Sequence, residues 1–236
     1  MISKTRLQTL VREFQVDDVV SGLREKPELL EFRDQRGRNW LHLCASVDVS
    51  TKRHLDPQDS VRLAGDLLDL GIDINGPAFT EGSWQATPLW YAVGRGRNRP
   101  LANFLLASGS TAEHCLWAAS FREDLKMLQL LVDAGAPLEA VAEGETALLG
   151  AVKNSKFKAA RLLLGAGSDP NFQDAKGMTA LHYMLKKNSD KSHYGMFMEH
   201  DARGDIQGPG GETASAILRR KRDPYFREIA DQLATN

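Results

Sequence analysis

The chain has 236 residues, of which 42% are hydrophobic and 26% are charged, as in an ordinary soluble globular protein. Its 30 basic and 31 acidic residues give a net charge of −1, which argues against nucleic-acid binding through bulk positive charge. Two cysteines, Cys44 and Cys115, are too few for a disulfide framework, so we expect buried free thiols in a cytoplasmic protein. We expect neither a secretory signal nor a membrane span, because no apolar run is long enough for either.

The first 33 residues are predicted to form a helical cap. We predict one helix over Lys4–Phe14 and a second over Asp17–Phe32. The second helix is expected to be interrupted near Pro27, because proline removes a backbone donor and clashes with the preceding turn.

Three short patterns recur along the rest of the chain. The first opens a helix, with a Thr that accepts a backbone N–H and an apolar run after it. It occurs at Thr87-Pro88-Leu89, Thr146-Ala147-Leu148, Thr179-Ala180-Leu181-His182 and Thr213-Ala214, and Thr146 and Thr179 are 33 residues apart. The second pattern is an apolar helix that ends in a glycine suited to a left-handed cap, at Gly71, Gly109, Gly135 and Gly167. The third is the turn that follows, at Asp73–Asn75 and Asp169–Asn171.

These motifs resemble the ankyrin family, whose unit of about 33 residues opens a helix with Thr-Pro-Leu-His-x-Ala. Asn39–Ala45 and Thr179–His182 match that opening closely, and Thr87–Ala92 differs by Trp in place of His. The resemblance implies an all-α solenoid of stacked helix-turn-helix units with short β-hairpin or loop fingers. We predict an N-terminal helical cap over 1–33, five degenerate ankyrin repeats over 34–207, and a C-terminal capping repeat over 208–236. The repeats are 34–77, 78–111, 112–141, 142–173 and 174–207, and the last cap has helices at Thr213–Lys221 and Pro224–Leu233.

Three departures from the repeat are informative, because the stack itself does not require them. A polar insertion, Val47–Asp59, is predicted to separate the two helices of the first repeat. A longer hairpin, Gly76–Ala86, carries Phe79 and Trp84, which either fold back onto the adjacent repeat or anchor a partner. The short interval over residues 109–135 predicts a missing finger, either a notch that receives a partner or a loss through drift.

The ankyrin resemblance implies partner binding on a concave surface of hairpin tips and first helices. The residues predicted to bind are Arg36, Arg38, Phe79, Trp84, Arg95, Arg97, Phe121, Lys153, Lys176, Met178 and Lys186. Counting solvent-facing positions from each helix opening gives nine basic residues: Arg36, Arg38, Arg95, Lys153, Lys176, Lys186, Lys187, Arg220 and Lys221. The same count gives three acidic residues, Glu143, Glu145 and Glu212, and also includes Val47, Ala86, Gly94, Ser120 and Ala142. The counted face is therefore +6 on a chain of −1, which would steer an acidic partner; the alternative is that these cations only solvate the surface.

We therefore expect a monomeric module that binds an acidic protein partner and has no catalytic activity, cofactor or metal. His42 and His182 match the family's structural histidine, whose ring supports neighbouring hairpins, and no Cys-x-x-Cys pair indicates zinc. Two alternatives remain open. Nucleic-acid binding through the basic groove would weaken steeply with salt. An enzyme grafted on the repeat insertions would have a pocket with converging titratable groups.

Overall fold

The computed structural model describes residues 2–79 and 85–233, which form two compact units, Met1–Cys115 and Leu116–Asn236. We refer to them as unit 1 and unit 2 and describe each by itself. Unit 1 contains α1 (Lys4–Arg12), α2 (Val16–Glu25), the 3-10 helix η1 (Pro27–Glu31), α3 (Trp40–Ala45), α4 (Pro57–Asp69), β1 (Ala78–Phe79), β2 (Gln85–Ala86), α5 (Pro88–Tyr91), the π-helical turn η2 (Ala92–Gly96) and α6 (Arg99–Ala107). The two short strands are antiparallel, with Ala78 opposite Ala86 and Phe79 opposite Gln85.

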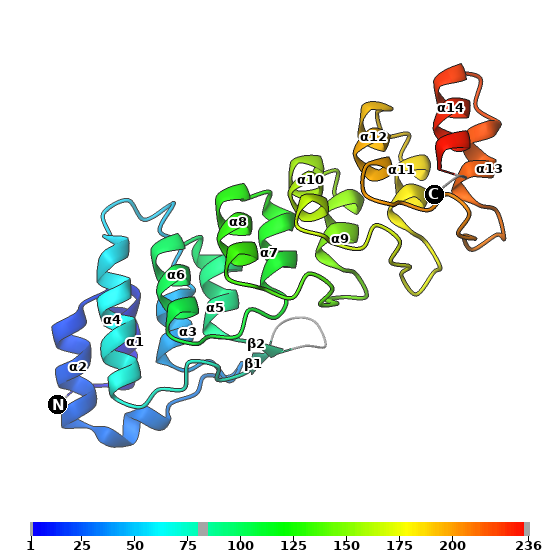
Figure 1. Ribbon diagram of the computed structural model, residues 1–236. Helices are drawn as coiled ribbons and strands as arrows, with labels where there is room; N and C mark the ends of the chain where they lie inside the picture. The colour runs from blue at the N-terminus through cyan, green and yellow to red at the C-terminus, as the bar shows by residue number, and fades with distance from the viewer. Residues whose placement is uncertain (1, 80–84, 234–236) are drawn as a thin grey trace. The chain divides into compact units, whose positions relative to one another are not determined.

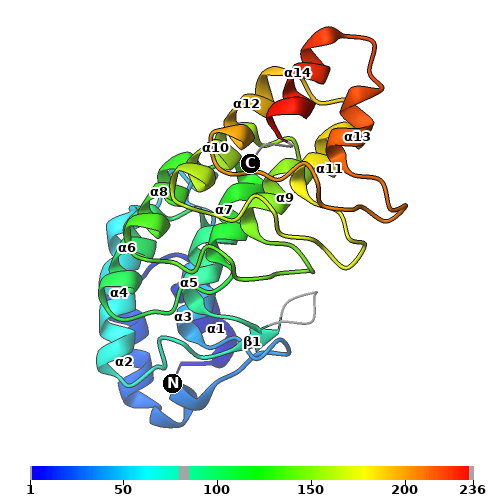
Figure 2. The ribbon, with the colours of Figure 1, turned by 45° about the vertical axis from the view of Figure 1, so that its right-hand side comes forward.

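The elements of unit 2 are all helices in the part of the chain that the structure describes. They are α7 (Cys115–Arg122, which begins on the last residue of unit 1), α8 (Leu125–Asp133), α9 (Ala147–Lys153), α10 (Phe157–Gly165), α11 (Ala180–Lys186), α12 (Ser192–Met198), α13 (Ala214–Arg219) and α14 (Pro224–Gln232). Within this unit, α9, α11 and α13 lie in one row and α8, α10, α12 and α14 in another (Figure 1). The loops before α9, α11 and α13 extend to one side as fingers (Figure 2).

The predicted helix caps are confirmed at each recurring motif. The hydroxyl oxygens of Thr87, Thr146, Thr179 and Thr213 accept the backbone N–H three residues later. Such a bond satisfies a donor that the first turn of a helix leaves without an internal partner. The predicted turns are also present: the Oδ1 of Asp73 accepts the N–H of Asn75 at 2.9 Å, and Asp169 does the same for Asn171 at 2.8 Å.

The helices of the N-terminal cap are shorter than predicted. The first ends at Arg12 and not at Phe14, because Phe14 has a left-handed backbone with φ of 52°. The second covers Val16–Glu25, and the rest of the predicted span is the 3-10 helix η1, which begins at Pro27. The interruption expected at Pro27 is therefore confirmed, and the helical segment beyond it is a 3-10 helix and not an α-helix.

Stacking buries the first helix of each repeat more completely than the second. Every residue of α3 is buried, as is α11 except for its last residue, Lys186. Within unit 2, α9 packs against α11, and α11 packs against α13. A single helix pair could not cover these apolar surfaces, so the neighbouring pairs complete one another's core. Among the described residues, no helix is long and apolar enough to cross a membrane.

Two histidines join successive repeats, as the ankyrin resemblance implied. The Nδ1 of His42 lies 3.2 Å from the backbone N of Asn39, and its Nε2 lies 3.2 Å from the carbonyl oxygen of Ala86 in the next finger. His182 has the equivalent position, with Nε2 3.4 Å from the carbonyl oxygen of Glu212. Burial lowers the pKa of His42 to about 4 and also lowers the pKa of His182, so both rings are neutral at pH 7.

The insertion in the first repeat lies between α3 and α4, as predicted, and it braces unit 1 on two sides. Lys52 forms an ion pair with Glu13 at 2.8 Å beyond the end of α1. On the other side, the N–H of Val49 donates to the carbonyl of Gly96 in η2 at 3.1 Å. The insertion therefore connects the cap to the second repeat.

Candidate functional site

The first finger of unit 1 is a tight turn organised by Asp34. Its carboxylate accepts the backbone N–H groups of Arg36 at 2.9 Å and Arg38 at 3.0 Å, and pairs with the Arg38 guanidinium at 2.7 Å. Partial burial opposes the charge, but the hydrogen bonds from Arg38 and Arg36 outweigh it and lower the pKa of Asp34. The predicted cation Arg38 is thus largely neutralised, while Arg36 is exposed at the tip.

Phe79 lies beside this turn and remains in solvent. Its N–H donates to the carbonyl of Arg36 at 2.7 Å, and 60% of its surface is exposed. Phe79 is therefore bonded to the adjacent turn through its backbone, while most of its side chain is exposed. The second aromatic of the same hairpin, Trp84, lies outside the described residues.

Arg95 and Arg97 are exposed at the end of the first helix of the second repeat. The π-helical turn η2 adds a residue to this helix, and such turns are frequent at functional sites. Arg97 has a left-handed backbone with φ of 49°, and its guanidinium donates to the hydroxyl of Ser50 at 3.3 Å. The insertion therefore holds one of the two predicted arginines.

In unit 2, Phe121 belongs to an aromatic pair on α7. Its ring stacks on Trp117 with centroids 5.5 Å apart, and half of its surface is exposed. A Cβ built on Gly150 of α9 would lie 3.0 Å from the Nε1 of Trp117, so the glycine makes room for the indole. Because Trp117 is held between α7 and α9, it supports the exposed Phe121 ring.

A chain of polar contacts extends from α9 to the next finger. Lys153 forms an ion pair with Glu145, and its ammonium lies 5.0 Å from the centre of the Tyr183 ring. Partial burial would lower the pKa of Lys153, but its hydrogen bond to Glu145 outweighs this and raises it. The hydroxyl of Tyr183 donates to Asp174 at 2.5 Å. Asp174 in turn accepts the N–H of Lys176 at 2.9 Å, the same turn that Asp34 organises in unit 1.

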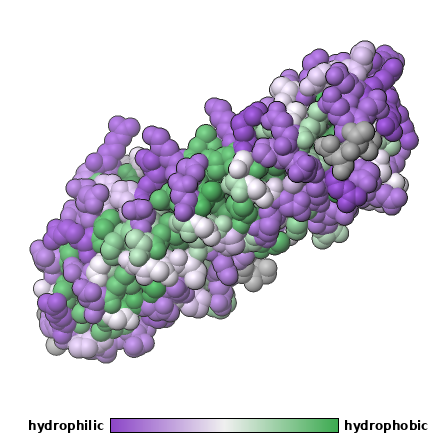
Figure 3. Space-filling view, viewed as in Figure 1, coloured by the Kyte–Doolittle hydropathy of each residue, from purple (hydrophilic) through white to green (hydrophobic). Residues whose placement is uncertain are grey.

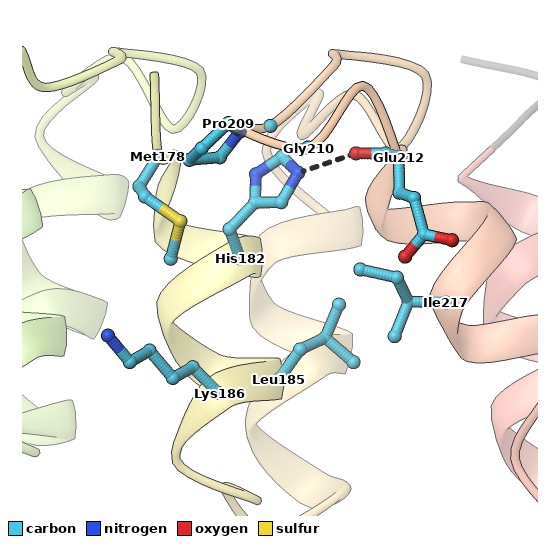
Figure 4. A pocket seen from close by; sticks show the side chains of 9 residues that line it. Met178, His182, Leu185, Lys186, Pro209, Gly210, Glu212 and Ile217 are labelled. Carbon is cyan, nitrogen blue, oxygen red and sulfur yellow. Dashed lines mark hydrogen bonds between the residues drawn. The ribbon is translucent and has the colours of Figure 1, made fainter. Parts of the chain in front are cut away.

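Met178 and Lys186, both predicted binding residues, line one pocket of unit 2 (Figure 4). The pocket has a volume of about 280 Å³ and lies between α11 and the finger that precedes α13. Its lining is Met178, His182, Leu185, Lys186, Gly208, Pro209, Gly210, Glu212 and Ile217. Apolar side chains provide most of the lining, and Lys186 and Glu212 provide opposite charges. This composition suits an apolar side chain flanked by polar groups.

The predicted face needs two corrections. Five of its counted positions are buried, because they pack under the fingers or against neighbouring helices: Val47, Ala86, Gly94, Ser120 and Ala142. The count also omitted Asp34 and Asp174, whose carboxylates face counted positions. Nine basic and five acidic residues give these positions a net charge of +4 in place of +6.

The most informative residues missed at the sequence level are Trp117 and Tyr183. Trp117 stands four residues before Phe121 on one helix, the spacing at which side chains meet. Tyr183 follows His182 in its repeat, as Tyr91 follows Trp90 in the second. Both patterns can be read from the sequence. The hydrogen bond between Tyr183 and Asp174 cannot, because it depends on how the finger packs back against its helix.

In the described part of the chain, neither thiol is reactive and no group of side chains is arranged as a metal centre. Burial raises the pKa of both the Cys44 and the Cys115 thiols, so neither is a reactive thiolate in the folded protein. Over residues 2–79 and 85–233, no cluster of three or more His, Cys, Asp or Glu side chains could hold a metal ion.

The comparisons with known proteins agree on the repeat. The family described as ankyrin repeats (3 copies) matches residues 115–207. The chain is 30% identical over 168 residues to the ankyrin repeat protein FPV022 of Fowlpox virus (strain NVSL). That match covers 69% of this chain but 27% of the viral protein, so the chain spans about a quarter of this relative.

Solved structures extend the likeness to the fold of nearly the whole chain. The ankyrin repeat domain of Bcl-3, a member of the IkappaB protein family, has a TM-score of 0.77 at 20% identity. The alignment covers 98% of this chain and 100% of that domain. The human ASB11 ankyrin repeat domain has a TM-score of 0.69 at 16% identity and covers 98% of both chains. Together with the motifs and the stacked helix pairs, these matches show that residues 115–207 carry ankyrin repeats and that the chain has the ankyrin-repeat fold.

Proposed function

We propose that the chain binds an acidic protein partner through its finger turns and first helices, and that it acts by binding and not by catalysis. The pocket between α11 and the finger before α13 is the observation that carries this proposal. It joins two consecutive repeats, has a mostly apolar lining, and includes Met178, Lys186 and Glu212, which the repeat pattern assigned to the predicted face. We further propose that the chain is a monomer and acts in the cytoplasm. Its two buried free thiols would stay reduced there.

The acidity of the partner is supported by cations that the protein itself does not neutralise. Lys176 and Lys186 are exposed, and neither has an ion-pair partner among the described residues. Lys153 and Arg220, in contrast, are paired with Glu145 and Glu212. Exposed, unpaired cations beside an apolar pocket would accelerate association with an acidic segment and orient it.

In unit 1 the proposal assigns the exposed Phe79 ring and the Arg36 tip to partner contact. Large aromatic side chains and arginines are frequent binding hot spots because they bury much surface with few rotatable bonds. Trp84 is proposed as a further contact residue only because the sequence predicts an aromatic anchor in this hairpin.

The test is capture of partners from the native cell, with proteins identified by mass spectrometry. We expect the double variant Lys176→Glu, Lys186→Glu to capture roughly tenfold less of the specific partner than wild type does. The substitutions replace attraction between the lysines and an acidic partner by repulsion. The control Arg222→Glu, Arg227→Glu makes the same charge change at exposed positions with no ion-pair partner in the described chain. Equal capture by wild type and the Lys176/Lys186 variant would reject the face, and capture of no specific protein would reject the function.

A further inference from the structure

A second surface of unit 2 lies on the second helices, away from the fingers. An apolar pocket of about 340 Å³ is lined by Leu125 of α8, by Phe157, Lys158 and Arg161 of α10, and by His193 and Met196 of α12. Figure 3 shows apolar surface exposed among polar side chains over α8 and α10. We propose that this back pocket binds an acidic protein segment that inserts one apolar side chain, and that it does so independently of the finger side.

The floor of the back pocket is built by an aromatic stack that bridges two repeats. The rings of Phe157 and His193 are 3.7 Å apart at their centroids and inclined by 14°. Phe157 begins α10 and remains partly exposed, while Met196 is buried beneath the surface. The floor is therefore packed and largely apolar, and burying an aliphatic or aromatic side chain on it would be favourable.

The charges at the rim decide the chemistry of the occupant. Lys158 and Arg161 are exposed, and no ion-pair partner for either exists within residues 2–79 and 85–233. The lining contains no carboxylate in the described chain, in contrast to the finger-side pocket with Glu212. Glu123, which is not part of the lining, accepts the backbone N–H of Lys158 at 3.2 Å and forms no ion pair with the Lys158 ammonium among the described residues. Cations on one side of an apolar cavity complement carboxylates that flank an apolar residue.

The repeat itself does not require this arrangement. When the two repeats are aligned on Gly135 and Gly167, the glycines that follow α8 and α10, Gln129 corresponds to Arg161. Gln129 donates to Asp133 of its own helix at 2.7 Å. The same alignment places Leu125 in the position of Phe157. The larger ring and the free guanidinium thus belong to this repeat in particular.

The test uses labelled synthetic peptides in which a central Leu, Met or Phe is flanked by Asp and Glu. Two matched peptide sets replace the central residue by Ala, or the acidic flanks by Lys. Binding to the full chain is measured by fluorescence anisotropy. We expect only the acidic set with an apolar centre to bind, and the variant Lys158→Glu, Arg161→Glu to weaken binding roughly tenfold. The control Arg222→Glu, Arg227→Glu should change it less than about twofold.

Methionine methyl resonances then locate the bound peptide, because each pocket contains one methionine. Binding in the back pocket should shift Met196 and leave Met178 of the finger-side pocket unchanged. Shifts at Met178 alone, equal binding of the Ala or Lys sets, or an unaffected Lys158/Arg161 variant would overturn the proposal. So would the absence of binding up to about 1 mM peptide. Circular dichroism of each variant confirms that it is folded, and none of these outcomes depends on the capture experiment for the finger side.

Discussion

Replacing Gly96 by alanine is expected to lower the free energy of unfolding of unit 1 by at least about 3 kcal/mol, at or above the upper end of the usual cost of overpacking. A Cβ on Gly96 would stand 2.2 Å from the carbonyl oxygen of Ala45 and 3.2 Å from that of Val47. Both neighbours are backbone atoms at the end of α3, so no side-chain rotation can relieve the contact. Urea denaturation of the Gly96→Ala variant measures the loss.

Gly65 provides the matched control in the same unit. It lies inside α4, and a Cβ there would meet only the Phe104 ring at 3.7 Å, an ordinary contact distance. Gly65→Ala should therefore be neutral or should stabilise the protein by up to about 1 kcal/mol, as alanine is the better helix former. A Gly96→Ala variant as stable as wild type would show that η2 can move away from α3.

The Gly96 contact also affects the proposed binding face. The carbonyl of Gly96 accepts the N–H of Val49, and the two arginines next to it in sequence, Arg95 and Arg97, are exposed. Gly96 therefore allows the second repeat to approach the insertion of the first repeat closely. This approach fixes the positions of Arg95 and Arg97.

The parts of the fold that could be predicted are those that local chemistry determines. Thr146 and Thr179 each cap the helix that follows them, and His182 has the same role in its repeat as His42 has in the first. A repeat that matches the motif closely therefore identifies the more degenerate copies. The π-helical turn at Ala92–Gly96 could not be predicted, because it results from fitting Gly96 against the end of α3, a tertiary contact.

The candidate site was predicted less completely than the fold, for an electrostatic reason. Counting residues from the helix openings treated Arg38 and Lys153 as free cations. The structure pairs Arg38 with Asp34 of its own turn, and pairs Lys153 with Glu145. A charge count cannot tell an exposed ammonium from one whose field is cancelled at hydrogen-bond distance. Lys186 differs because it projects from the end of α11 with no ion-pair partner in the described chain.

Acidification from pH 6.5 to 4 is expected to remove about 3 kcal/mol of stability through His42 alone. Burial depresses the pKa of this ring to about 4, against 6.5 for an unperturbed histidine. Between these values the unfolded chain binds a proton that the folded chain does not, so the free energy of unfolding falls as the pH decreases and levels off below about 4. His182, whose pKa is also lowered by burial, adds a loss of the same sign.

The variant His42→Gln separates this contribution from that of the carboxylates. Glutamine can still donate to the Ala86 carbonyl but does not titrate, so the variant should be less stable than wild type at pH 7 and should lose less stability on acidification. The carboxylate of Asp174, whose pKa is lowered in the fold, destabilises both proteins equally as it is protonated, whereas the charge of Asp34 acts on His42 and is part of the His42 contribution. The difference between the two pH profiles therefore belongs to His42. Direct titration of its ring protons by NMR provides the decisive check, because a midpoint near 6.5 in the folded protein would mean that the bridge between the first two repeats tolerates a charge.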